Sequence, residues 1–326
     1  MFWVLLRGAL MIHGEKESLE TAVASLKEAG FAVSQTCCSR PSCFDFAARK
    51  GEKLVFAKFL PDVDSFSQSD SLELVGLSEC VSAAPLLIGE KTRETPLEDD
   101  TVYSRYNIYA VTPKTFENIM TGKTHPLIQA GPGGYYVEID GRAIKHRRHE
   151  LGLSVGKTAE IIGISRRTLY GYERGMAKAS VTAAYNMIHT LGIPAAKTVN
   201  VFEKPRNQRA CRFLATARDL VAKHKILMRI FEKSSRYRLS TFRRAPFDFV
   251  ITVPEDKKKI IGGVAKTKEQ GLDRRIDEIL SVSQIVQAYP ILIMEGKELP
   301  NRNISCIHHE ELAKIKRPED LISNAT

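Results

Sequence analysis

The chain has 326 residues, of which 43% are hydrophobic and 26% are charged, with a net charge of +10. This composition is typical of an ordinary globular protein with two or three domains, and it excludes a chain dominated by membrane-spanning segments. The excess of lysine and arginine falls in residues 140–244, whereas residues 1–139 carry more acidic than basic side chains. We therefore expect one polyanion-binding region in the middle of the chain.

Neither the cysteines nor the N-terminus indicates a zinc site, a membrane anchor or export. The six cysteines form no C-x-x-C pair, so we expect no structural zinc and a reduced, cytoplasmic protein. The apolar start, residues 1–12, is too short to span a membrane. It also lacks the basic leader and the cleavage site of a signal peptide. Met11 directly precedes the first predicted helix and is a second candidate for the start of translation.

Residues 1–125 predict an α/β domain. The stretch 15–31 has a helical pattern, with Gly30 as the residue that stops the helix. Extended segments follow at 31–38, 43–49 and 53–60. A second helix over 70–84 then leads into an apolar strand at 85–90.

The same order of elements recurs in residues 201–326. A long apolar stripe predicts a helix over 209–233, and it is followed by three extended segments, a helix over 273–289 and an apolar strand from residue 290. The matching pairs are Asp45 with Asp248, Lys58 with Lys266, Pro85 with Pro290, and Val111 with Ile307. Matches in the same order predict a duplicated domain.

A different pattern lies between the two copies. Residues 126–139 are rich in proline and glycine and contain one alternating strand-like stretch, so we expect a linker. Residues 140–200 predict four short helices, the first over 142–151 with Ile144 and Leu151 facing inward. Ser154, Ser165 and Ser180 stand where helix N-caps are needed. Two short helices joined at Gly163 predict a helix-turn-helix, whose second helix enters the DNA major groove.

The stretch "GLSVGKTAEIIGISRRTLYGYERG" resembles the repressor/Cro type of helix-turn-helix. The matching positions are Ser154, Ala159, Gly163, Ser165, Thr168, Tyr172, Glu173 and Gly175. Val155 stands where the family often has a DNA-contacting glutamine, and Gly171 replaces a longer side chain. The whole chain also resembles a group of archaeal HTH-type transcriptional regulators, through its Phe-Asp motif, "PLLIGEKTR" and "GGYYVEIDG".

The resemblance implies that double-stranded DNA is the partner and that residues 165–174 form the recognition helix. Arg166 and Arg167 would reach base edges, and Tyr170 faces the same way one turn later. The full predicted DNA-binding set is Ser154, Lys157, Thr158, Ser165, Arg166, Arg167, Thr168, Tyr170, Arg174, Arg147 and Arg148. We expect Leu169 and Tyr172 to be core residues. The alternative to base contact by Arg166 and Arg167 is that they lie on a solvated helix face. The basic residues of 203–244 could add DNA backbone contacts, or they could form the charged outer face of a packed helix.

The element order around the two Phe-Asp-Phe motifs resembles the restriction-endonuclease-like fold. That fold uses an Asp, and then an acidic residue two positions before a Lys, to hold Mg²⁺ and stabilise the phosphate. In this chain the position two residues before the Lys holds Phe56 in the first copy and Val264 in the second, where an acidic residue is needed. We therefore expect two degenerate domains with no catalytic residue, metal or cofactor, in which Asp45 pairs with Lys58 and Asp248 with Lys266.

Two alternatives remain at this stage. A metal-dependent nuclease of a restriction or repair system would need a migrated acid, for which Glu17, Glu20 and Glu269 are the candidates. A regulator that senses a small molecule would need a pocket, and no sequence pattern predicts one. The favoured prediction is a DNA-binding transcriptional regulator with three domains, acting as a homodimer held by the flanking domains.

Overall fold

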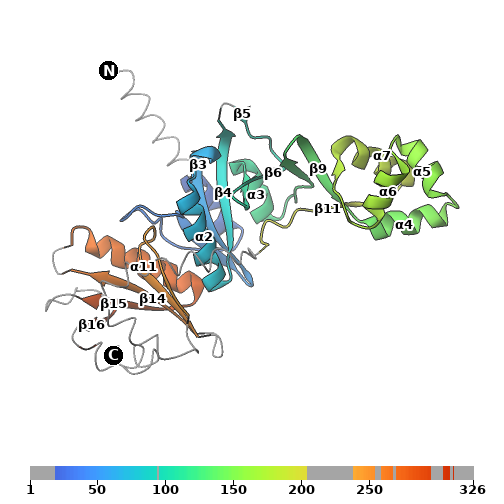
Figure 1. Ribbon diagram of the computed structural model, residues 1–326. Coiled ribbons are helices and arrows are strands. Elements are labelled where there is room, and N and C mark those ends of the chain that lie inside the picture. The colour runs from blue at the N-terminus through green and yellow to red at the C-terminus, as the bar shows by residue number, and fades with distance from the viewer. Residues whose placement is uncertain are drawn as a thin grey trace, which may run out of the picture.

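The computed structural model describes residues 19–93, 95–203, 238–253, 258–266, 269–294, 304–308 and 311. Figure 1 shows two α/β domains side by side and a smaller helical domain projecting from the first of them. The predicted helix over 209–233, most of the basic block 203–244 and Glu17 lie outside the described residues. Within the described part of the chain, no helix is long and apolar enough to cross a membrane.

The first α/β domain is built on a mixed sheet. Its strands run in the order β1 (Ala32–Val33), β2 (Phe46–Lys50), β3 (Lys53–Asp62), β4 (Ala84–Thr92) and β7 (Ile108–Val111). The first two pairings are antiparallel, and β3–β4 and β4–β7 are parallel. The turn η1 (Val63–Ser65) and helix α2 (Gln68–Val81) connect β3 to β4, and α3 (Pro113–Thr121) follows β7.

Alternation along β3 sends its side chains into two different cores. Val55 and Ala57 pack with Phe116 of α3 and with Leu26 of the helix at residues 19–28. Phe56 faces the opposite way, into a core that continues into the second α/β domain. Two apolar faces on one sheet explain why this strand reads as a nearly continuous apolar run.

The second α/β domain has a sheet of the same order and directions. Its strands are β12 (Arg238–Thr241), β13 (Phe249–Val253), β14 (Lys258–Ala265), β15 (Tyr289–Met294) and β16 (Ser305–His308). The pairings β12–β13 and β13–β14 are antiparallel, and β14–β15 and β15–β16 are parallel. Helix α11 (Leu272–Val286) lies between β14 and β15, as α2 lies between β3 and β4.

The strand register shows which residues correspond in the two domains. Phe46 pairs with Ala57, and Phe249 pairs with Gly262. Lys58, which follows Ala57, therefore corresponds to Gly263 and not to Lys266. The predicted match of the two lysines is wrong by three positions.

The two α/β domains contact each other reciprocally. In the first, Glu73 of α2 accepts hydrogen bonds from the backbone amides of Arg243 and Arg244, at 2.9 and 2.8 Å. In the second, Glu278 of α11 accepts from the amides of Cys38 and Ser39, also at 2.9 and 2.8 Å. Each carboxylate therefore binds the segment that precedes the Phe-Asp-Phe motif of the other domain.

The helix ends and the shared core repeat this reciprocity. Arg49 donates to the carbonyl of Ile285 near the end of α11, and Lys259 donates to the carbonyl of Val81 at the end of α2. Phe44 and Phe247 approach to 6.4 Å between ring centroids. The two domains are thus arranged about an approximate two-fold axis.

A β-hairpin joins the first domain to the helical domain. The sheet continues from β7 through β6 (Thr101–Arg105) to β8 (Ile128–Gly131) and β9 (Gly134–Ile139), which turn at Gly133 with φ +83°. Short strands β10 (Ala179–Ser180) and β11 (Ala196–Lys197) pair with β9, and β5 (Thr95–Pro96) pairs with β4. The segment 126–139 therefore contains two strands and not one.

The helical domain contains α4 (Gly141–Glu150), α5 (Val155–Ile162), α6 (Arg166–Glu173) and α7 (Val181–Leu191). They enclose a separate core in which Ile144, Leu169 and Met187 are fully buried. The expectation that Leu151 faces inward is wrong, because the residue follows the last turn of α4 and is 42% exposed.

Candidate nucleic-acid interface

Helices α5 and α6 form a helix-turn-helix whose ends are fixed by local hydrogen bonds. The Ser154 hydroxyl accepts from the Lys157 amide at 3.1 Å, and the Ser165 hydroxyl accepts from the Thr168 amide at 3.0 Å. Gly163 ends α5 with φ +81°, a left-handed conformation that favours glycine. Ala159 is 1% exposed, as expected where two helices cross closely. These contacts fix where the two helices begin and where α5 ends.

One side of α6 is buried and the other carries cations. Leu169 and Tyr172 are 0% and 7% exposed, so the prediction that they are core residues is confirmed. Arg166, Arg167 and Arg174 are exposed. Arg174 lies over the exposed ring of Tyr170, 4.5 Å from its centroid. This face carries the positive charge expected of a surface that meets phosphates and base edges.

Arg166 rests on the first turn of α5. A Cβ added to Gly156 would lie 2.8 Å from Nε of Arg166. The absence of a side chain at position 156 therefore makes room for this arginine between the two helices. Sequence reasoning gave Gly156 no role, because the contact depends on how α5 and α6 cross.

Arg148 forms an ion pair in the core of the helical domain and does not reach a phosphate. It is 5% exposed, and its guanidinium donates to both carboxylate oxygens of Glu173, at 2.6 and 3.0 Å. A third bond reaches the carbonyl of Leu153 at 3.0 Å. The bonds to Glu173 raise the pKa of Arg148. The prediction that Arg148 contacts DNA is wrong, because the side chain is buried and binds Glu173 at the end of α6.

Other members of the predicted set are also engaged within the domain. Thr158 is 0% exposed and donates to the carbonyl of Ser154, so its predicted DNA contact is wrong as well. Arg147 is half-buried and binds Glu150 and the carbonyl of Leu191. Lys157 is exposed and lies 3.2 Å from Glu160. The hydroxyls of Ser165 and Thr168 lie 2.8 Å apart.

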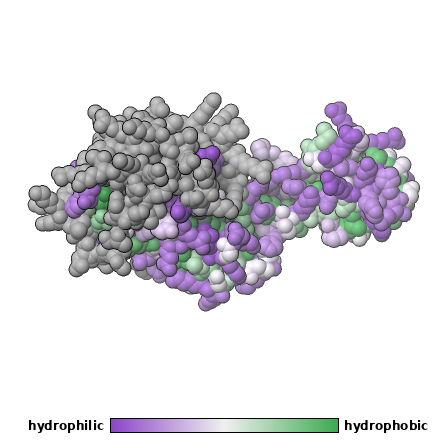
Figure 2. All heavy atoms as spheres, turned by 90° about the horizontal axis from the view of Figure 1, so that it is seen from below, coloured by the Kyte–Doolittle hydropathy of each residue, from purple (hydrophilic) through white to green (hydrophobic). Residues whose placement is uncertain are grey.

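In the view of Figure 2, the projecting helical domain shows mostly hydrophilic side chains with apolar patches between them. Helix α4 adds exposed cationic and imidazole side chains that the predicted set did not include, namely Arg142, Lys145, His146 and His149. Their signal in the sequence was the charge of the segment, which does not say which side chains are buried.

In the first α/β domain, the Asp of the nuclease-like motif is neutralised by the Lys. Asp45 Oδ1 lies 2.7 Å from Lys58 Nζ, and Oδ2 accepts from the amide of Phe59 at 2.7 Å. Phe56, at the position of the second acid, is fully buried against Phe44 with 4.7 Å between the ring centroids. The predicted Asp45–Lys58 ion pair is confirmed.

In the second α/β domain, two arginines hold the corresponding aspartate. Arg275 Nη2 lies 2.6 Å from Asp248 Oδ2, and Arg40 of the first domain lies 2.8 Å from Oδ1. The predicted Asp248–Lys266 pair is wrong, since Lys266 is exposed and corresponds to no position of the motif. The register places Ile261, not Val264, at the position of the second acid, and that residue is fully buried too.

Arg275 takes the place of the missing lysine. The Cβ of a side chain at Gly263, the counterpart of Lys58, would lie 3.4 Å from Nη2 of Arg275. Glu269, a candidate for a migrated acid, lies 2.9 Å from the same guanidinium. Among the described residues, no group of three or more His, Cys, Asp or Glu side chains could hold a metal ion.

Comparison with known proteins finds a family model for two of the three domains. A family model described as "PD-(D/E)XK superfamily domain" matches residues 15–126, and one described as "Helix-turn-helix" matches residues 144–197. A relative from Methanocaldococcus jannaschii, named "Putative HTH-type transcriptional regulatory protein", is 33% identical over 87% of this chain and 88% of its own length. The chain belongs to this archaeal family.

Further relatives with the same name extend the match over most of the chain. One from Methanococcus maripaludis is 30% identical over 93% of this chain and 95% of its own length. One from Pyrococcus furiosus is 28% identical over 87% and 89%. A solved HTH_3 family transcriptional regulator from Vibrio cholerae covers 35% of this chain and 56% of its own, at 21% identity and a TM-score of 0.16, a likeness too weak to carry an argument.

Proposed function

We propose that this family member is a sequence-specific, double-stranded DNA-binding transcriptional regulator whose helix α6 enters the major groove. The observation that carries this proposal is the division of α6 into a buried face and an exposed face. Leu169 and Tyr172 anchor the helix, and Arg166, Arg167 and Tyr170 stand free of the core. Arginine side chains at the start of such a helix can pair bidentately with guanine.

The experiment that tests sequence recognition is selection from a random duplex pool by the full chain. The proposal predicts an enriched motif that binds more tightly than a scrambled duplex of the same length and composition. Recovery of unenriched sequences, with affinity governed by salt alone, would show binding to the DNA backbone only.

We infer that the two α/β domains share an origin by duplication and that neither cleaves DNA. Matching strand order, reciprocal Glu73 and Glu278 contacts and corresponding aspartates support the duplication. Cationic partners on Asp45 and Asp248, in place of a second acid, support the loss of cleavage. Incubation of plasmid DNA with the protein and Mg²⁺ or Mn²⁺ tests this. Cutting that Asp45→Asn or Asp248→Asn abolishes would establish the alternative, a metal-dependent nuclease.

We propose further that the protein acts in the cytoplasm as a homodimer on paired half-sites, since each chain contributes one helix-turn-helix. The face formed by α2 and α11 is filled within the chain, so two copies would meet through another surface. Light scattering at micromolar protein with the selected duplex should report two chains per duplex. A single chain per duplex would reject the dimer while leaving DNA recognition intact.

A further inference from the structure

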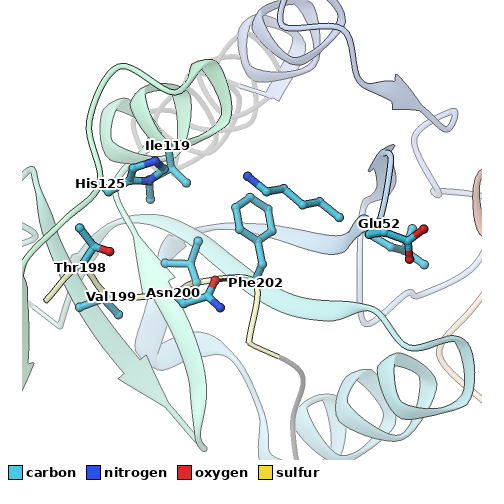
Figure 3. Close-up of a pocket in the computed structure, with 10 residues that line it drawn as sticks. Glu52, Ile119, His125, Thr198, Val199, Asn200 and Phe202 are labelled. Atoms are coloured by element: carbon cyan, nitrogen blue, oxygen red, sulfur yellow. Dashed lines mark hydrogen bonds between the residues drawn. The ribbon is translucent and has the colours of Figure 1, made fainter.

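A cavity of about 420 Å³ lies between the first α/β domain and the segment that leaves the helical domain. Its apolar lining includes Leu54 at the start of β3, Ile119 of α3 and Phe202. Its polar lining includes Lys53, His125 and Thr198. Figure 3 shows His125, Thr198 and Phe202 around the opening, with Glu52 at the far side from His125. A volume of this size suits a small organic molecule.

The wall of the cavity is held in place by hydrogen bonds that backbone amides donate. The amide of Val199 donates to the carbonyl of Pro126 at 2.8 Å, and the amide of Phe202 donates to Asn200 Oδ1 at 3.1 Å. Val201 is 2% exposed and packs into the core beneath α3. The cavity is therefore formed before any molecule enters it, which lowers the entropy lost on binding.

The polar groups at the opening are available to a ligand. The Lys53 ammonium lies 4.7 Å from the centroid of the Phe202 ring. Within the part of the chain that the structure describes, neither the Lys53 ammonium nor the His125 ring has a hydrogen-bond or ion-pair partner. A cation, an imidazole and a hydroxyl beside an aromatic face form a binding surface for an acidic group attached to a flat body.

We propose that this cavity binds a small molecule that carries a carboxylate or a phosphate on a flat apolar body. The acidic group would meet Lys53 and His125, and the body would lie on Phe202, Leu54 and Ile119. The segment 198–202 directly follows β11, which pairs with β9 beside the helical domain. A bound molecule thus touches both the first α/β domain and the chain leaving the helical domain. Binding at this site does not depend on the proposed DNA recognition.

The test is a titration of the full chain with benzoate and with phenyl phosphate, followed by amide cross-peaks in nuclear magnetic resonance spectra. Benzyl alcohol serves as the neutral analogue. The proposal predicts saturable shifts at Lys53 and residues 199–202, with at least about tenfold weaker binding of the alcohol, equivalent to about 1.4 kcal/mol. If only phenyl phosphate or only benzoate saturates the site, the ligand class is narrowed to that acid.

Two lysines of one hairpin provide the matched variants. Lys50 pairs with Lys53 across β2 and β3 and also lies over an aromatic ring, that of Phe31 at 5.6 Å, but outside the cavity. Lys53→Gln should abolish saturable binding, whereas Lys50→Gln should leave it unchanged. Phe202→Leu should weaken both acids and leave the fold intact. Equal binding by the two lysine variants, equal binding of the alcohol, or shifts confined to α4 and α6 would overturn the proposal.

Discussion

Removal of the Glu173 carboxylate should destabilise the helical domain far more than removal of an exposed carboxylate on α4. Arg148 and Glu173 have side chains only 6% and 5% exposed and share bonds of 2.6 and 3.0 Å. Glu173→Ala leaves the buried Arg148 guanidinium with the carbonyl of Leu153 as a partner, and a stranded buried charge costs about 3–5 kcal/mol. Glu150 is 46% exposed where it pairs with Arg147, so Glu150→Ala should cost about 0.2–1 kcal/mol.

Native-state hydrogen exchange of amides in α5 and α6 measures this difference without requiring the whole chain to unfold in one step. The expected result is a loss of at least about 3 kcal/mol in opening free energy for Glu173→Ala, against about 1 kcal/mol or less for Glu150→Ala. Losses of the same size in the two variants would refute the assignment of Arg148 to the core. They would also return Arg148 to the candidate DNA contacts.

Three further predictions concern other parts of the chain. Gly156→Ala should stabilise helix α5 by up to about 1 kcal/mol. It should nevertheless weaken binding to the selected duplex, because the new Cβ displaces Arg166. Unchanged affinity in an anisotropy titration would contradict this prediction. Burial raises the pKa of Glu73, so the folded state holds this proton more tightly and stability falls as pH rises above about 4.3. The free energy of unfolding of Glu73→Gln, which cannot ionise, should therefore increase relative to that of the parent as pH rises above about 4.3 in urea titrations. A difference that does not change with pH would contradict the burial effect. Because Lys58 already neutralises Asp45, adding about 10 mM Mg²⁺ should leave the melting temperature of the chain the same as in EDTA. A rise in melting temperature that Asp45→Asn abolishes would reveal a metal site.

The parts of the fold that depend on local sequence were predictable. Ser154, Ser165 and Ser180 cap their helices as expected, because a cap needs only its own side chain and the next turn. The buried face of α6 followed from helical periodicity. The Asp45–Lys58 pair followed from two adjacent strands whose register is fixed by a short turn.

The errors fall where a distant segment decides the environment. Arg148 lies on a helix rich in charge, and only the partner Glu173 explains why it is buried. The Ala-Lys dipeptides at Lys58 and Lys266 suggested a false match, because a repeated dipeptide does not fix strand register. The pairing of Phe46 with Ala57 and of Phe249 with Gly262 makes Gly263 the counterpart of Lys58. The arginine that replaces the missing lysine comes from α11, and a second one comes from the other domain. The cavity was hidden in the same way, since three separated segments line it.

The central claim is that α6 reads DNA through Arg166 and Arg167, and the most direct measurement is the affinity of Arg166→Ala/Arg167→Ala for the selected duplex. Lys91→Ala/Arg93→Ala, on the first α/β domain, removes the same charge and serves as the control. Two bidentate contacts of about 1–3 kcal/mol each predict a loss of at least about 30-fold for the α6 variant, with helicity unchanged. The control should lose far less. Parent-like affinity in the α6 variant, or an equal loss in the control, would contradict the account.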